Sequence, residues 1–150
     1  MVHEDDVALI CRWFGRLAQH MQAVDYHQAR PLFAEDVIAF GSFSNFLVGR
    51  EALEREQWRK VWGVTDGFQC RIDELHVIVS GDRLTAVGMV MFDSTGYSED
   101  GTSYGRPGRS TVVFGRGAIS EDWLAQHVHF SLSPGVPPRS FGNKPEKRIG

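Results

Sequence analysis

The sequence DWLAQHVHFSLSPG, residues 122–135, is a strand-like run in which two histidines lie two positions apart. Side chains alternate between the two faces of a sheet along a strand. This alternation predicts that one face carries His127 and His129 with Trp123, Ala125 and Ser131, and that the other carries Leu124, Gln126, Val128 and Phe130. The rest of the chain determines which of these faces is turned inward.

Three more strand patterns precede this one, at residues 68–80, 84–97 and 109–117. They are rich in β-branched and aromatic residues, and each ends at a turn-forming sequence such as SGDR at 80–83. Four consecutive strands joined by turns predict an antiparallel meander.

The N-terminal half has helical patterns. Apolar residues recur at intervals of three and four along residues 6–24, which predicts a long amphipathic helix with the acidic Asp5 and Asp6 at its positive end. A short second helix at 25–33, a strand at 36–42 and a third helix at 49–62 complete the predicted order.

The strand at 84–97 is apolar on both faces. Val90 and Phe92 lie on one face of the strand, and Val87, Met89 and Met91 lie on the other. One long helix can cover only one of these faces, so we expect the outer face of the meander to be covered by a second copy of the chain, as a homodimer.

Composition limits the class of protein. The chain has 150 residues, which fits one domain at 1–134, and its last residues, 135–150, are rich in proline, glycine and charge and predict an extended or disordered tail. A net charge of −3 argues against nucleic acid as a partner. No apolar run is long enough for a membrane span, and no signal peptide pattern is present, so we expect a cytoplasmic protein.

Two strings carry a family resemblance: LFAEDVIAFGSFSNFLVGREAL at 32–53, and GRSTVVF at 108–114 followed by the last strand. In this order and spacing they resemble the SnoaL-like proteins of the nuclear transport factor 2-like (cystatin-like) superfamily, near the association domains of calcium/calmodulin-dependent protein kinase II. The resemblance implies an α+β fold of order α-α-β-α-β-β-β-β. In that fold a strongly bent antiparallel sheet wraps around the long N-terminal helix and forms a cone with a cavity inside.

The resemblance also implies the lining of that cavity. It turns Gln126, Val128 and Phe130 inward and the two histidines outward, toward a subunit interface. An apolar pocket for a small apolar or amphipathic molecule is expected, with candidate ligand-binding residues Phe40, Trp58, Trp62, Met89, Met91, Val112, Phe114, Gln126, Val128 and Phe130, and with Arg109 as a polar end.

Catalytic candidates are the side chains that could transfer a proton: Tyr26, Asp36, His127 and His129. A His-x-His pair could begin a metal site, but no further histidine has ligand spacing, so no metal and no cofactor are predicted. Three functions stay open: a homodimeric pocket protein that binds a small molecule, a pocket enzyme of the isomerase, cyclase or hydratase type, and an oligomerisation module.

Overall fold

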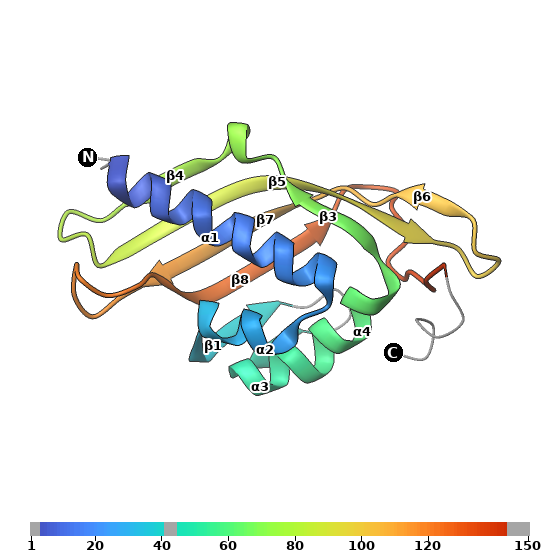
Figure 1. The fold of residues 1–150 in the computed structure, drawn as a ribbon, viewed down its shortest axis with the longest axis horizontal. Helices are drawn as coiled ribbons and strands as arrows, with labels where there is room; N and C mark the ends of the chain where they lie inside the picture. The colour runs from blue at the N-terminus through green and yellow to red at the C-terminus, as the bar shows by residue number, and fades with distance from the viewer. Residues whose placement is uncertain (1–3, 41–44, 144–150) are drawn as a thin grey trace.

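The computed structural model describes residues 4–40 and 45–143 (Figure 1). Its helices are α1 (Glu4–Ala23), α2 (Tyr26–Ala29), α3 (Arg50–Leu53) and α4 (Arg59–Val61), with a π-helical turn at Glu54–Trp58 and 3-10 turns at Arg30–Leu32, Trp62–Val64 and Ile72–Glu74. Its strands are β1 (Phe33–Phe40), β2 (Phe46–Val48), β3 (Asp66–Cys70), β4 (His76–Val79), β5 (Thr85–Tyr97), β6 (Ser103–Gly105), β7 (Gly108–Gly115) and β8 (Leu124–Leu132). The predicted α+β class is confirmed. The predicted end of the first strand at 41–42 and the last tail residues, 144–150, lie outside the described residues.

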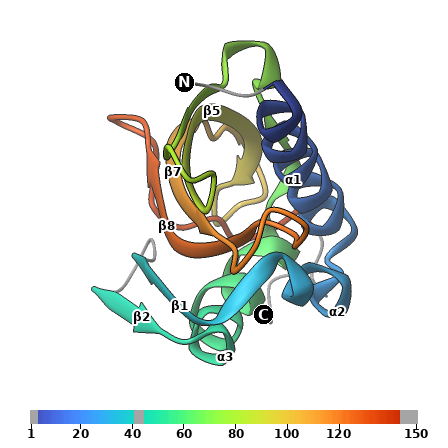
Figure 2. The ribbon, with the colours of Figure 1, turned by 90° about the vertical axis from the view of Figure 1, so that its left-hand side faces the viewer.

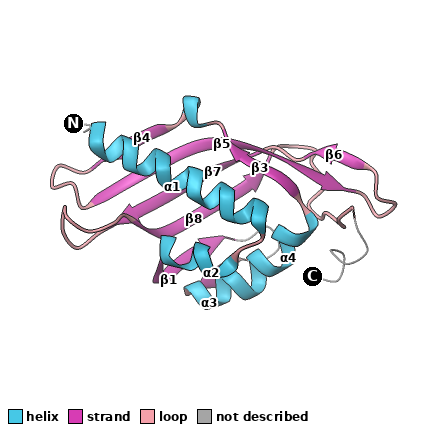
Figure 3. Ribbon diagram, in the orientation of Figure 1, coloured by secondary structure: helices cyan, strands magenta, loops and turns pink. Residues whose placement is uncertain are grey.

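The strands form a single large sheet in the order β2-β1-β8-β7-β5-β3, with β4 and β6 also paired to β5 (Figure 3). The predicted meander is present in β5, β7 and β8, which pair antiparallel. The strand predicted at 68–80 is broken by the 3-10 turn into β3 and β4, and both halves pair with β5. The sheet is mixed, because β1 pairs with β8 in parallel.

Helix α1 supplies the core of the concave side. Its apolar stripe buries Ile10, Trp13, Phe14 and Leu17 against the sheet. Viewed from the end, β5, β7 and β8 curve around and α1 lies along the open side of the curve (Figure 2). The close approach of α1 to β5 depends on Gly88 of β5, because a Cβ atom there would lie 2.8 Å from the ring of Phe14.

The third helical segment is less regular than predicted. In place of one α-helix over 49–62, α3 is followed by the π-helical turn, α4 and a 3-10 turn. The π turn changes the helical phase between Leu53 and Trp58, and both side chains are buried. The indole rings of Trp58 and Trp62 stack with a centroid separation of 4.7 Å in the second half of this segment.

Strand β8 contains a bulge that the alternation rule does not anticipate. Val113 pairs with His127 but Phe114 pairs with Ala125, so Gln126 is the extra residue. From His127 onward the faces are as expected, whereas before the bulge they are exchanged. Ala125 and Trp123 are therefore buried and Gln126 is exposed, which corrects the expected inward position of Gln126.

The described part of the tail is fixed to the sheet although it forms no helix or strand. The buried Ser140 hydroxyl donates to the carbonyl of Val64 and accepts from the backbone N–H of Tyr97. The Phe141 N–H donates to the carbonyl of Tyr97, and the hydroxyl of Tyr104 donates to the carbonyl of Arg139. Residues 135–143 thus close one end of the sheet beside β5 and β6.

Candidate ligand-binding pocket

An apolar pocket lies between the C-terminal half of α1, the third helical segment and the inner face of the sheet. It has a cavity volume of about 60 Å³. Its apolar lining consists of Leu17, Met21, Phe33, Phe40, Leu53, Trp58, Val61, Trp62, Phe68, Phe92, Val128, Phe130 and Leu132, and its polar lining consists of Gln57, Thr65, Arg106 and Ser131. The volume is small for so many lining residues, so the pocket is narrow.

Five of the ligand-binding candidates lie in this lining: Phe40, Trp58, Trp62, Val128 and Phe130. The ring of Phe130 packs against those of Phe68 and Phe92 from the other side of the pocket, at 6.2 and 5.8 Å between centroids. Phe40 borders the pocket at its edge, while its ring contacts the imidazoles of the outer face.

The remaining candidates lie elsewhere. Val112 and Phe114 are fully buried core residues outside the lining, with Phe114 packed edge-on against Trp13 and Phe14. Met89, Met91 and Arg109 lie on the opposite, outer face of the sheet, which differs from their expected place in the pocket. The reason is strand parity: on β5 the inward side chains are Ala86, Val90 and Phe92.

The histidine pair lies on the outer face. The Nδ1 atom of His127 is 2.7 Å from the carbonyl oxygen of Ile38 on β1, and the ring of Phe40 packs edge-on against both imidazoles. Within the described residues, no group of three or more His, Cys, Asp or Glu side chains is arranged to hold a metal ion. The pair therefore helps to join β1 to β8.

The two other proton-transfer candidates are also outside the pocket lining. Tyr26 is half-buried and stacks on Trp62 with a centroid separation of 5.4 Å, and the guanidinium of Arg59 lies over its ring. Burial raises the pKa of the Tyr26 hydroxyl. Asp36 is exposed, in the stretch of β1 where the pairing with β8 is irregular.

Arg106 is a buried cation of the pocket that the sequence patterns do not predict. Arg106 is 5% exposed, and burial lowers the pKa of its guanidinium. Nε of Arg106 has no hydrogen-bond partner among the described residues. The surrounding string GRPGR, residues 105–109, has the composition of a turn and contains both Arg106 and the predicted site residue Arg109. Only the tertiary structure separates the buried arginine from the exposed one.

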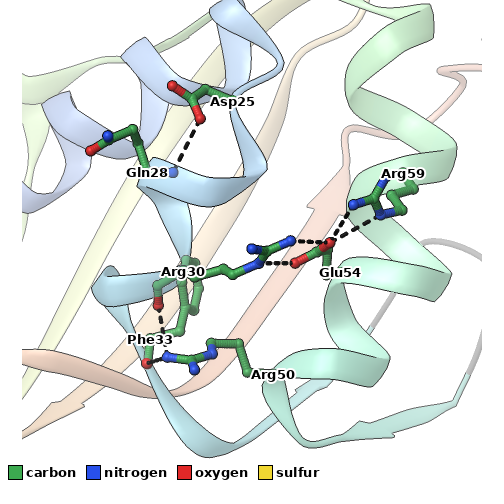
Figure 4. Close-up of polar contacts among 7 residues, drawn as sticks. All are labelled: Asp25, Gln28, Arg30, Phe33, Arg50, Glu54 and Arg59. Carbon is green, nitrogen blue, oxygen red and sulfur yellow. Dashed lines mark hydrogen bonds and ion pairs between the residues drawn. The ribbon is translucent and has the colours of Figure 1, made fainter.

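Beside the pocket, Glu54 joins the second and third helical segments (Figure 4). Its carboxylate accepts a bidentate pair of hydrogen bonds from Arg30, at 2.5 and 2.9 Å, and a further pair from Arg59. Arg50 continues the cluster by donating to the carbonyls of Arg30 and Phe33. The hydrogen bonds from Arg30 and then those from Arg59 lower the pKa of Glu54 to about 2.

This network predicts an acid-sensitive contribution to stability. Because the pKa of Glu54 is lower in the folded protein than its ordinary value of 4.5, the contribution is complete above about pH 4.5 and is lost as the pH falls toward 2. We expect Glu54→Gln to lower the free energy of unfolding by about 2 kcal/mol at pH 7 and to flatten its pH dependence below pH 5. Glu51→Gln, an exposed change in α3, is the control in urea unfolding from pH 2.5 to 7. An unchanged pH slope in Glu54→Gln would contradict the assignment.

The outer face of the sheet carries a shallow groove with a volume of about 430 Å³. It is lined by Glu74, His76, Met89, Val90, Met91, Arg109, Ser110, Thr111, His129 and Ser131. Six large hydrophobic residues are exposed among the described residues, and four of them extend this face at its edges: Ile38, Phe46, Val48 and Ile78. The apolar character predicted for both faces of the meander is thus present.

Comparison with known structures identifies the fold. An NTF2-like superfamily protein from Salmonella enterica is 19% identical and has a TM-score of 0.71, with 88% of this chain and 95% of that chain covered. A ketosteroid isomerase-like protein from Erwinia carotovora atroseptica is 13% identical with a TM-score of 0.71, covering 88% and 100%. The association domain of CaMKII from C. elegans is 15% identical with a TM-score of 0.62, covering 81% and 92%. At these identities the likeness shows the fold alone.

Comparison at the level of sequence identifies the family. No protein with a curated description matches the chain. No helix in the described residues has the length and hydropathy needed to cross a membrane. A model of the SnoaL-like domain matches residues 10–135, which is most of the chain. The resemblance stated from the two sequence strings is confirmed: the chain belongs to the SnoaL-like domain family.

Proposed function

We propose that this protein binds a small, largely apolar molecule in the pocket between α1, the third helical segment and β8. The observation that carries the proposal is the lining itself, in which aromatic and aliphatic side chains from several elements surround the space and only a few polar groups enter it. Ligand pockets have this character, with an apolar wall and a few polar groups that fix orientation.

Binding is favoured over acid–base catalysis by the composition of the wall. Among the described residues that line the pocket, none is a carboxylate or an imidazole. The four proton-transfer candidates have their side chains elsewhere: Tyr26, His127 and His129 pack outside the lining, and Asp36 is exposed.

The test uses the tryptophans as reporters. The chain has four, of which Trp58 and Trp62 line the pocket and Trp123 lies in the core under the guanidinium of Arg116. Titration with 1-butanol, an uncharged probe, should shift the indole N–H signals of Trp58 and Trp62 in a saturable way and leave that of Trp123 in place. Equal, unsaturable shifts of all the indole signals would contradict a pocket site.

We further propose that the protein is a homodimer that associates through the outer face of the sheet. Four of the six large hydrophobic residues that are exposed within the described part of the chain belong to this face, and its groove carries both an acidic residue, Glu74, and a basic one, Arg109. A twofold interface places the same patch on both partners, so such a mixture of charges can pair with itself. The CaMKII relative, named as an association domain, has the same fold.

Sedimentation at micromolar concentration should give twice the 16.9 kDa of one chain. Ile78→Lys, on the outer face at β4, should shift the protein toward monomer. Ile119→Lys changes a similarly exposed isoleucine in the loop between β7 and β8 and should leave the dimer intact. A monomer of the unmodified protein at tens of micromolar would contradict the dimer.

A further inference from the structure

We propose that the pocket is selective for a small monocarboxylate with a short apolar tail, and that Arg106 binds the carboxylate. The proposal rests on the proposed function, because it names the class of molecule that the same pocket takes. Four observations support it: the position of Arg106, the state of its charge, the chemistry of the remaining wall, and the volume of the cavity.

The backbone around Arg106 is held in place from β5. The N–H of Arg106 donates to the carbonyl of Ser94 at 2.7 Å, and the hydroxyl of Ser94 donates to the carbonyl of Arg106 at 2.6 Å. Pro107 follows and fixes a further backbone angle. This double attachment to one strand holds the arginine at the pocket, where its side chain contributes to the lining.

The charge of Arg106 is not balanced within the described residues. Arg116, whose side chain is 1% exposed, is paired with the carboxylate of Asp6, and Arg30 is paired with Glu54. Arg106 is almost as buried as Arg116, and far more buried than Arg30, yet it has no ion pair with a described carboxylate and its Nε has no acceptor. A buried guanidinium stays charged and is costly to leave without an anion.

The rest of the wall restricts which anion can bind. A guanidinium matches a carboxylate as a planar fork with two parallel hydrogen bonds. One buried cation balances one negative charge, whereas a phosphate dianion would leave excess charge among the rings of Phe92 and Phe130. Of the remaining polar groups, the hydroxyl of Thr65 already donates to the carbonyl of Val61. The wall therefore suits one carboxylate attached to an apolar body.

The cavity volume limits the size of that body. About 60 Å³ is well below the roughly 150 Å³ of a cavity that accepts benzene. A chain of two or three carbons beyond the carboxylate fits this range. Propionate is the matching probe, and propionamide is its uncharged isostere with the same number of non-hydrogen atoms.

The experiment compares these two probes at constant ionic strength, with the indole signals of Trp58 and Trp62 as the readout. We expect propionate to bind at least tenfold more tightly than propionamide. Arg106→Met should remove this preference and should raise the melting temperature of the ligand-free protein by about 2–4 °C, because an unbalanced buried charge is removed. Arg109→Met removes the same charge from the outer face, three positions away in the sequence, and should keep the preference.

The possible outcomes distinguish failure of the carboxylate proposal from failure of the proposed pocket. Equal affinity for the two probes in the unmodified protein, with 1-butanol still bound at Trp58 and Trp62, overturns the carboxylate proposal and leaves the apolar pocket standing. A preference that survives in Arg106→Met places the anion elsewhere and also overturns it. If Arg106→Met does not fold, Arg106→Gln replaces it. The preference for propionate, read from the indole signals of Trp58 and Trp62, is then compared between Arg106→Gln and the unmodified protein. If neither 1-butanol nor propionate shifts these signals, the proposed function itself fails.

Discussion

Replacing Asp6 by asparagine is expected to lower the free energy of unfolding by about 3–5 kcal/mol. The carboxylate is fully buried in the first turn of α1. It accepts hydrogen bonds from Nε of Arg83 at 2.8 Å and from Nη2 of Arg116 at 2.9 Å. These bonds, with that from Arg83 the strongest cause, lower the pKa of Asp6. Asparagine would leave two cations together without their shared anion.

The effect should be large because Arg116 cannot easily turn to water. The side chain of Arg116 is 1% exposed, stacks on the ring of Trp123 at 3.8 Å, and donates from Nε to the carbonyl of Arg83. Urea unfolding at pH 7 measures the loss, with Asp5→Asn as the matched control one residue earlier on the exposed side of the helix. A loss below about 1 kcal/mol in Asp6→Asn would show that the cluster relaxes without its carboxylate.

The second large effect is expected from Phe130→Arg. Phe130 contacts the rings of Phe68 and Phe92, so the change removes aromatic packing and adds a second guanidinium to the pocket that already holds Arg106. Lost packing and an unpaired charge together should lower the free energy of unfolding by about 3 kcal/mol or more. The melting temperature should then rise on addition of propionate by more than in the unmodified protein, because the anion would reduce the repulsion between two neighbouring guanidinium groups.

The adjacent residue provides the control. His129→Gln changes a side chain on the outer face, where we expect a change within about 0.5 kcal/mol and unaltered binding of 1-butanol. The two variants therefore test which face of β8 is the inner one. If His129→Gln abolished binding while Phe130→Arg left both stability and binding unchanged, the described faces of β8 would be reversed.

Local patterns were sufficient to predict most of the fold. The apolar spacing of α1 and the β-branched runs of β5, β7 and β8 are local patterns, so these elements follow from the residues, whereas the inward position of Val128 was implied by the family resemblance. The bulge at Gln126 does not follow from local patterns, because it depends on how β7 and β8 pair across the sheet. The parallel pairing of β1 with β8 joins residues about 90 positions apart and carries no local signal.

The site was less predictable than the fold for a related reason. Met89 and Val90 are both apolar, and the sequence of a strand that is apolar on both faces does not reveal which face lies against the helix. Arg106 and Arg109 lie three positions apart in a glycine- and proline-rich string, and only one of them is buried. Which arginine enters the pocket is decided by the hydrogen bonds between Ser94 and Arg106, which are tertiary contacts.

A crystal structure of the unmodified protein grown with propionate would show whether a small anion enters the pocket and binds Arg106. We expect density for one propionate whose carboxylate lies within hydrogen-bonding distance of the Arg106 guanidinium and whose ethyl group packs against Trp58. Propionate found only at exposed cations such as Arg109, with the side chains of Trp62 or Phe130 filling the pocket, would contradict it.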